Sequence, residues 1–362
     1  MFRLLFVGAA LAAPVVADEK AKPALTPKEI ADGWILLFDG ESTFGWAVEG
    51  EAKVEGGVLK LIGGEKGASL KTRVPFRAAD VRFETAKGTG PFDLFVTADK
   101  PLVRSTRDRV TRYAITLRPK VEMAFTPSID REATAIDVKS PVAEPFHLTV
   151  KVAAGQTALI TTVNLRPADA TPLFNGRDLF GWKVFPGAKD RKVTSKFTVT
   201  PEGWLNVKDG PGDLQTEGQW ADFVAQFDCI SNGKHLNSGL FFRCLPGQYQ
   251  QGYEAQIRNE WMGDDRTKPV DFGTGAIYRR QAARKVVSTD GEWFTMTVAA
   301  HGRNVATWVN GYPVVSWTDD RKESENARQG FKAGKGALSI QGHDPTTDLS
   351  FRNIRLQSLD SK

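Results

Sequence analysis

The sequence predicts an all-β protein made of two tandem antiparallel β-sandwich domains, and three observations carry this prediction. The chain has 362 residues, which is more than one hydrophobic core usually supports. A ten-residue motif occurs twice, as LFDGESTFGW at 37–46 and as LFNGRDLFGW at 173–182, with six identical positions. Short runs of alternating apolar and polar side chains, bounded by Gly, Asn or Asp, recur along the chain. These runs are typical of two-sheet sandwiches, and the repeated motif indicates that one sandwich follows another.

The first 17 residues predict a signal peptide. Arg3 provides a positive start, Leu4 to Ala13 form an apolar stretch, and Val15 to Ala17 offer a cleavage site before Asp18. A membrane anchor is the alternative, but the apolar stretch is too short to span a bilayer. We therefore expect a secreted or periplasmic protein with no membrane span after the signal is removed.

Residues 18–34 predict a linker with one short helix, because Thr26 is followed by Pro27 and then by Glu29 in the pattern of a capping box. The first sandwich is expected at 35–166 and the second at 172–359. The run NLRPADATP between them carries turn and breaker residues.

The second domain shows more strand signals than the first. The first domain is expected to be degenerate and to stop soon after FHLTV at 146–150, which resembles FTMTV at 294–298. It would then lack three strands that the second domain has at 314–317, 337–343 and 349–356. The other strands expected in the second domain are 223–230, 239–243, 253–258 and 305–310.

Strand alternation sorts the side chains of the second domain into two faces. Leu240, Phe242, Leu338 and Ile340 fall on the core face. The opposite faces are polar and hold almost no Lys, so we expect neighbouring strands to form a polar cleft from them. Its members would be Asn237, Arg243, Glu254, Gln256, Arg258, Gln341, His343 and Asn353.

Composition and missing motifs exclude several classes of protein. The net charge of +5 is small and spread along the chain, which argues against a nucleic-acid surface. There is no P-loop, no G-x-S-x-G elbow and no H-E-x-x-H zinc motif. The two cysteines, Cys229 and Cys244, are compatible with one disulfide or with two free thiols.

Eight short motifs occur in the second domain in a fixed order, and together they resemble the 3-keto-disaccharide hydrolase domain family. The motifs are LFNGRDLFGW, LNSGLFFR, GYEAQI, GTGAIY, DGEWFTMTV, WVNG, LSIQGHD and FRNIRL. The resemblance covers residues 172–359 and implies a concanavalin A-like jelly-roll fold. The first domain resembles the family only in its opening motif and a few strands.

The resemblance implies a carbohydrate ligand and cleavage of glycosides that carry a ketone at C3. Such a reaction needs a base for the C2 proton, a group that stabilises the enolate and an acid for the leaving oxygen. His343 and Glu254 are the candidates for base and acid, in either order, and Arg243 is the candidate for the enolate. Sugar hydroxyls would be held by Asn237, Gln256, Tyr278, Gln341, Trp293 and Asn353.

The sequence leaves alternatives open for the cofactor and for the function. Where family members often carry an Asp, this chain reads Arg258-Asn259-Glu260, and His343 stands one place later than the common spacing. A divalent metal ion held by His343 with Glu254 or Glu260 is one possibility, and no cofactor is the other. The same fold also hosts lectins and structural or adhesive surface proteins. For these, Arg243 would be an ion-pair partner, Glu254 a solvated carboxylate and His343 a turn residue.

Overall fold

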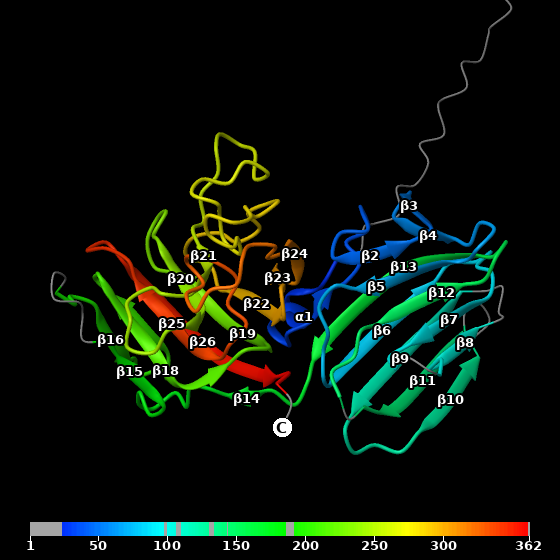
Figure 1. Ribbon diagram of the computed structural model, residues 1–362, viewed down its shortest axis with the longest axis horizontal. Coiled ribbons are helices and arrows are strands. Elements are labelled where there is room, and N and C mark those ends of the chain that lie inside the picture. The colour runs from blue at the N-terminus through cyan, green and yellow to red at the C-terminus, as the bar shows by residue number, and fades with distance from the viewer. Residues whose placement is uncertain are drawn as a thin grey trace, which may run out of the picture.

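The computed structural model describes residues 24–97, 100–105, 110–129, 134–142, 144–185 and 192–360, and it confirms two tandem β-sandwiches (Figure 1). The predicted signal peptide lies outside these residues. The only helix they contain, α1 (Pro27–Ala31), has the expected capping box, in which Thr26 Oγ1 accepts from the Glu29 N–H and the Glu29 carboxylate accepts from the Thr26 N–H. No helix in the described ranges approaches the ~20 apolar residues that crossing a bilayer requires.

The first sandwich packs a sheet of eight strands against a sheet of five. The larger sheet has the order β10-β11-β9-β6-β13-β4-β3, with β1 also paired to β13, and the smaller has the order β2-β5-β12-β7-β8. All pairs are antiparallel except β9 with β11. The strands are β1 (Ile35–Leu36), β2 (Trp46–Glu49), β3 (Glu51–Glu55), β4 (Val58–Ile62), β5 (Ala68–Thr72), β6 (Ala79–Thr85), β7 (Phe92–Phe95), β8 (Val103–Ser105), β9 (Thr111–Arg118), β10 (Ala124–Ile129), β11 (Thr134–Pro141), β12 (Thr149–Val152) and β13 (Thr157–Pro167).

The second sandwich has the same two-layer plan. Its larger sheet has the order β16-β17-β26-β19-β22-β23-β24, with β14 on β26, and its smaller sheet has the order β15-β18-β25-β20-β21. The strands are β14 (Thr171–Pro172), β15 (Trp182–Val184), β16 (Lys196–Val199), β17 (Leu205–Lys208), β18 (Gly212–Trp220), β19 (Phe223–Ser231), β20 (Ser238–Cys244), β21 (Tyr253–Ile257), β22 (Phe294–His301), β23 (Asn304–Val309), β24 (Tyr312–Thr318), β25 (Gly336–Gly342) and β26 (Asp348–Ser358).

The strand orders show that the first sandwich is more complete than the sequence predicts. β12 takes the central place in its small sheet that β25 takes in the other. In the large sheet β13 takes the place of β26, and β10 takes the edge place of β24. The expectation that these strands are missing is therefore wrong. The comparison of FHLTV with FTMTV is also wrong, because the first run leads into β12 of a small sheet and the second opens β22 of a large sheet. Short alternating runs do not specify the sheet to which they belong.

The repeated motif forms the same turn in both sandwiches. Trp46 donates its indole N–H to the Leu37 carbonyl at 2.6 Å, and Trp182 donates to the Leu173 carbonyl at 2.7 Å. Each indole is buried and therefore needs a partner for its donor. The motif thus fixes where the first strand of each small sheet starts.

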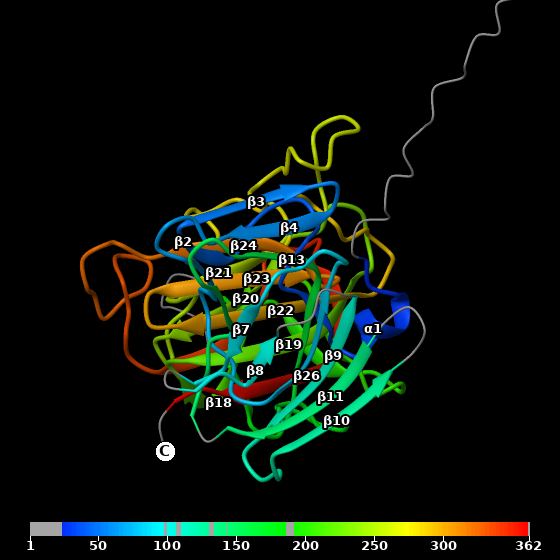
Figure 2. The ribbon, with the colours of Figure 1, turned by 90° about the vertical axis from the view of Figure 1, so that its right-hand side faces the viewer.

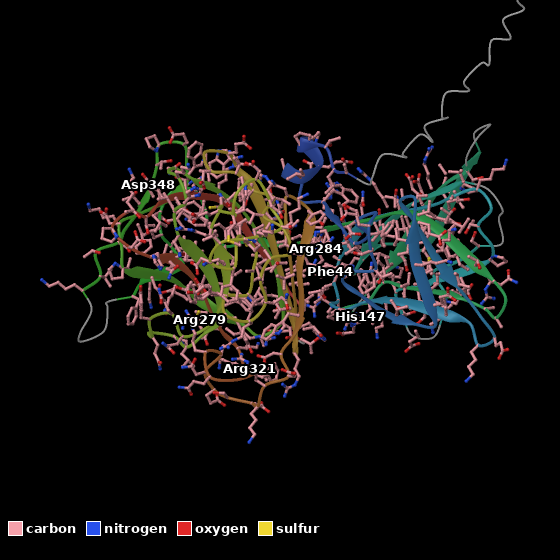
Figure 3. All side chains as sticks on the ribbon, turned by 90° about the horizontal axis from the view of Figure 1, so that it is seen from above. Phe44, His147, Arg279, Arg284, Arg321 and Asp348 are labelled. Carbon is pink, nitrogen blue, oxygen red and sulfur yellow. The ribbon has the colours of Figure 1, made fainter. Side chains whose placement is uncertain are left out.

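The two sandwiches lie side by side in Figure 1, and the first sandwich faces the viewer in Figure 2. A buried contact joins them. Trp308 of β23 packs into the core of the first sandwich and donates its indole N–H to the Leu36 carbonyl at 2.9 Å. Figure 3 shows Arg284 and Phe44 together at this junction, and the Arg284 guanidinium lies 4.5 Å from the Phe44 ring centroid. The two sandwiches therefore share apolar and polar contacts.

Both cysteines are buried free thiols, so the structure contains no Cys229–Cys244 disulfide. Cys229 lies in the main core of the second sandwich, and Cys244 packs with Phe241 and Ala337 in a separate cluster.

Candidate functional site

A cleft of about 980 Å³ lies over the outer face of the small sheet in the second sandwich. This volume is at the upper end of the range for small-molecule sites and leaves room for more than one sugar ring. Its floor includes residues of β21 and β25, and the rest of its lining comes from the loops between strands. It is lined by Phe185, Asn237, Gly247, Gln248, Tyr249, Gln250, Gln251, Glu254, Gln256, Tyr278, Arg279, Arg328, Gln341 and His343.

Glu254 is the buried carboxylate of the cleft, with 4% of its surface exposed. Arg328 donates to its Oε2 atom at 3.3 Å. Burial raises the pKa of Glu254 to about 7, although the Arg328 charge acts in the opposite direction. A carboxyl group with this pKa exchanges protons readily near neutral pH, which is what a general base or acid requires.

Gly239 creates the space in which this carboxylate lies. The two residues are on the paired strands β20 and β21, and a Cβ atom at position 239 would lie 2.9 Å from Glu254 Oε1. Only a residue without a side chain leaves that position open. The sequence places a glycine there, directly before the apolar run Leu240 to Phe242.

Amide side chains form the wall next to Glu254. Asn237 donates to Asp271 Oδ2 at 3.0 Å, and Gln256 donates to the same oxygen at 3.1 Å. Asp271 belongs to the long loop 258–293 that rises above the sandwich in Figure 1. Asn237 Oδ1 and Gln341 Oε1 have no hydrogen-bond partner among the described residues. Buried acceptors without partners are uncommon, and at a cleft wall they are suited to hydroxyl donors of a ligand.

Tyr278 and His343 complete the part of the site that the sequence predicts. Tyr278 comes from the loop 258–293, and its neighbour Arg279 holds its guanidinium 5.4 Å from the tyrosine ring centroid. His343 follows β25 directly, and its Nδ1 atom lies 2.7 Å from Asp344 Oδ2. This contact engages Nδ1 and makes Nε2 the ring nitrogen that can act on a ligand.

Arg243 is not part of the cleft, which corrects its predicted place beside Glu254 and His343. Its side chain is 1% exposed and donates to the Ala221, Gly302 and Lys332 carbonyls and to Asp222. β20 holds one extra residue between Phe241 and Cys244, so strand alternation is lost there, and Arg243 has a φ of 49°. Arg243 is therefore a structural ion-pair partner, as the lectin or structural-protein alternative expects.

Trp293 and Asn353 also lie elsewhere: Trp293 directly precedes β22 and Asn353 belongs to β26, both strands of the large sheet. Trp293 packs edge-on against Trp204 and under the Arg352 guanidinium, whose carbon is 3.9 Å from the ring centroid. Asn353 donates to Asp228 Oδ2 at 2.7 Å. Both were expected to hold substrate, but they face a different sheet from Glu254.

Only two of the three residues proposed to bind a metal, Glu254 and His343, line the cleft. Glu260 accepts from Arg258 at 2.8 Å and lies outside it. Across the residues that the structure describes, no three His, Cys, Asp or Glu side chains are grouped as metal ligands. Two candidate ligands, one of them paired with Arg328, are fewer than the three protein ligands of an ordinary catalytic metal site, so the donor set does not fit a bound divalent ion.

The cleft also contains residues that the sequence patterns did not reveal. Arg328 arrives from the loop between β24 and β25 and fixes the rim by donating to the Gln250 carbonyl at 2.9 Å. Phe185 and Tyr249 form an aromatic pair with ring centroids 6.2 Å apart. Loop residues have no periodicity that would place them, so strand alternation cannot find them.

The second sandwich matches a known domain family. The family described as 3-keto-alpha-glucoside-1,2-lyase-like domain matches residues 169–357, just over half of the chain and a segment that contains the whole cleft. No curated protein matches the chain in sequence.

Several solved structures are similar to half of the chain. A candidate glycosyl hydrolase from Parabacteroides distasonis is 23% identical over 53% of this chain and 94% of its own, with a TM-score of 0.43. A carbohydrate-binding module from Bacillus subtilis is 14% identical over 49% and 96%, with a TM-score of 0.35. A β-glucanase from Bacillus licheniformis is 11% identical over 52% and 97%, with a TM-score of 0.34.

Proposed function

The chain belongs to the 3-keto-alpha-glucoside-1,2-lyase-like family, and we propose that its second sandwich cleaves glycosides that carry a ketone at C3. The family supports a carbohydrate-active enzyme in general terms. The observation that carries the specific reaction is the buried Glu254 carboxylate with a pKa of about 7, on the floor of a cleft lined by amides.

Glu254 is the proposed base. A ketone at C3 acidifies the hydrogen on C2, and the carboxylate removes it as a proton while the C–H electron pair forms an enolate. The enolate electrons then reform the C3 carbonyl, make a C1–C2 double bond and expel the oxygen at C1. The products of this step are an unsaturated keto sugar and an alcohol once the leaving oxygen gains a proton. Water can add to C1 of the unsaturated sugar to give the free keto sugar.

The other cleft residues supply charge and hydrogen bonds for this sequence. Arg328 takes the part expected of Arg243, because its positive charge lies at the cleft beside Glu254 and offsets the charge of the enolate. His343, oriented by Asp344, donates the proton to the leaving oxygen. The amide oxygens of Asn237 and Gln341 accept from sugar hydroxyls.

A direct assay tests the proposal. Purified protein is incubated with 3-keto-trehalose, 3-keto-sucrose and the two unmodified disaccharides, and the released sugars are separated and identified. Release from the keto sugars alone is expected, with an unsaturated or hydrated keto sugar as product. Binding of sugars without release would reject the enzyme in favour of a lectin, and equal hydrolysis of unmodified sugars would reject the ketone-dependent mechanism.

We also propose that the protein is exported, as the first 17 residues predict. In a host with a signal peptidase, the N-terminal sequence of the mature protein should begin at Asp18. A mature chain that still begins at Met1 and stays inside the cell would contradict export.

A further inference from the structure

The small sheets of the two sandwiches can be compared residue by residue because their strands pair in the same register. Trp46 pairs with Thr72 between β2 and β5, and Trp182 pairs with Thr216 between β15 and β18. Both tryptophans are the last residue of the repeated motif. Counting along the paired strands from this common point gives the counterpart of each cleft residue in the first sandwich.

The counterparts have lost the proposed base and gained positive charge. In the second sandwich, Glu254 of β21 pairs with Phe241 of β20. The counterpart of Phe241 in the first sandwich is Phe95 of β7. Extending the register between β7 and β8 by one residue pairs Phe95 with Leu102, so Leu102 is the counterpart of Glu254. Leu102 cannot take a proton. Lys71 of β5 stands in the place of Gln215 of β18, and Lys151 of β12 stands in the place of Gln341 of β25. Arg104 of β8 stands in the place of Gln256 of β21.

A groove of about 320 Å³ lies on this face of the first sandwich. Lys71 and Lys151 occupy diagonal positions on the paired strands β5 and β12, and both are exposed. Its lining residues are Ala47, Glu49, Ser69, Lys71, Phe95, Thr97, Thr149 and Lys151.

The acidic groups of the face have hydrogen-bond or ion-pair partners, whereas neither lysine has a carboxylate partner in the described part of the chain. Glu49 accepts from the Ser69 hydroxyl at 3.1 Å, and Asp93 forms an ion pair with Arg104 at 3.0 Å. Neither Lys71 nor Lys151 forms an ion pair with any residue that the structure describes. The two ammonium groups outnumber the single Glu49 carboxylate that also lines the groove, and this excess of positive charge favours an anionic ligand.

We propose that this groove is a non-catalytic binding site for a saccharide that carries carboxylate groups, such as a chain of uronic acids. The Lys71 and Lys151 ammonium groups would pair with carboxylates on successive sugars. Phe95 offers an apolar ring, with Lys151 4.9 Å from its centroid, and Thr149 and Ser69 offer hydroxyls. The site is separate from the catalytic cleft, and the proposal holds whether or not the cleft is an enzyme.

The test compares two double variants of the full mature chain that change the net charge equally. Lys71→Gln/Lys151→Gln installs the residue type found at both counterpart positions. Lys120→Gln/Lys139→Gln removes two exposed lysines of the same sandwich outside the groove. Binding of oligogalacturonate, a neutral oligosaccharide of similar length and inorganic sulfate is measured by titration calorimetry at low and high salt.

Oligogalacturonate should bind the unaltered chain in preference to the neutral oligosaccharide, and high salt should weaken it. The groove variant should bind it roughly tenfold more weakly, while the control variant should bind within about twofold of the unaltered chain. Equal weakening in both variants would overturn the proposal, because binding would then depend on net charge alone. Sulfate binding as tight as that of oligogalacturonate would also overturn it, since a simple anion site would be sufficient.

Discussion

The Asp39 carboxylate of the first repeated motif accepts a hydrogen bond at 2.7 Å from the guanidinium of Arg284, which belongs to the second sandwich. Asp39 Oδ1 also accepts from two backbone N–H groups of its own turn. In the second motif, Asn175 closes the same kind of turn by accepting from Arg177 and Asp178. The charge of Asp39 therefore serves the contact between sandwiches, and the turn needs only its oxygen.

Asp39→Asn should keep the turn but weaken the contact between the sandwiches. The Asp39 side chain is 1% exposed, so the loss of this charged partner is expected to cost about 1–3 kcal/mol of the free energy of unfolding. Chemical denaturation measures the change. The matched control is Glu55→Gln, which removes a surface ion pair with Lys53 and Lys60 and should change stability little. Equal effects of the two substitutions would contradict the role assigned to Asp39.

Glu254→Gln should lower kcat for a 3-keto glycoside by roughly 10²- to 10⁴-fold, because the amide cannot accept the C2 proton. The amide retains nearly the same shape, so KM should change little. Glu260→Gln is the control, since Glu260 pairs with Arg258 and does not line the cleft. Turnover of Glu254→Gln at the normal rate would remove Glu254 from the mechanism.

The pH dependence of kcat/KM should report the Glu254 carboxyl. With a pKa of about 7, the carboxyl is protonated at lower pH and cannot act as a base, so activity should fall as the pH drops through 7. The Arg328 charge lowers this pKa, so Arg328→Gln should move the acid limb of the profile to higher pH, and Arg328→Lys should move it less. A limb that stays in place in Arg328→Gln would show that another group controls the profile.

Gly239→Ala should displace the Glu254 carboxylate without unfolding the protein. The new methyl group would meet Glu254 Oε1 at 2.9 Å and Cγ at 3.0 Å, which is closer than its 3.3 Å approach to the Ala255 carbonyl oxygen, so the Glu254 side chain is the group that has to move. Misplacing the base should lower kcat by roughly 10- to 100-fold, with little change in the melting temperature. Gly334→Ala is the control, because its Cβ would meet only Lys332 Nζ at 3.6 Å.

His343→Ala should slow release of an alcohol by roughly 10²-fold, because the leaving oxygen would lack its acid. A 4-nitrophenolate leaving group needs no proton, so the same substitution should affect a 4-nitrophenyl 3-keto-glucoside much less. Comparing the two substrates separates an acid from a residue that only shapes the cleft. An equal loss with both leaving groups would reject the acid role, and His235→Ala, which lies outside the cleft lining, provides the control.

The sequence predicted those parts of the site that depend on regular strands. Glu254 and Gln256 were placed on one face because β21 follows strict alternation, and Gln341 was placed likewise on β25. The same counting failed at Arg243, because the bulge in β20 between Phe241 and Cys244 interrupts the alternation after Phe242. Local runs contain no information on such an extra residue, which is defined only by the partner strand.

Residues held by loops were the second source of error. Arg328 reaches Glu254 across 74 positions of the chain, and no motif marks that contact. Trp293 is expected from the sequence to hold substrate, but its ring packs against Trp204 and Arg352. The cleft volume and the side-chain hydrogen bonds were needed to distinguish these cases.

The buried indole of Trp308 determines how the second sandwich should behave when it is separated from the first. A truncated chain beginning at residue 169 would contain every cleft residue but would expose that ring, together with Val224 and Ala299, to water. Such a fragment should aggregate or need a polar replacement at position 308 to remain in solution. The first sandwich thus acts as a permanent cover for its neighbour, whatever ligand it also binds.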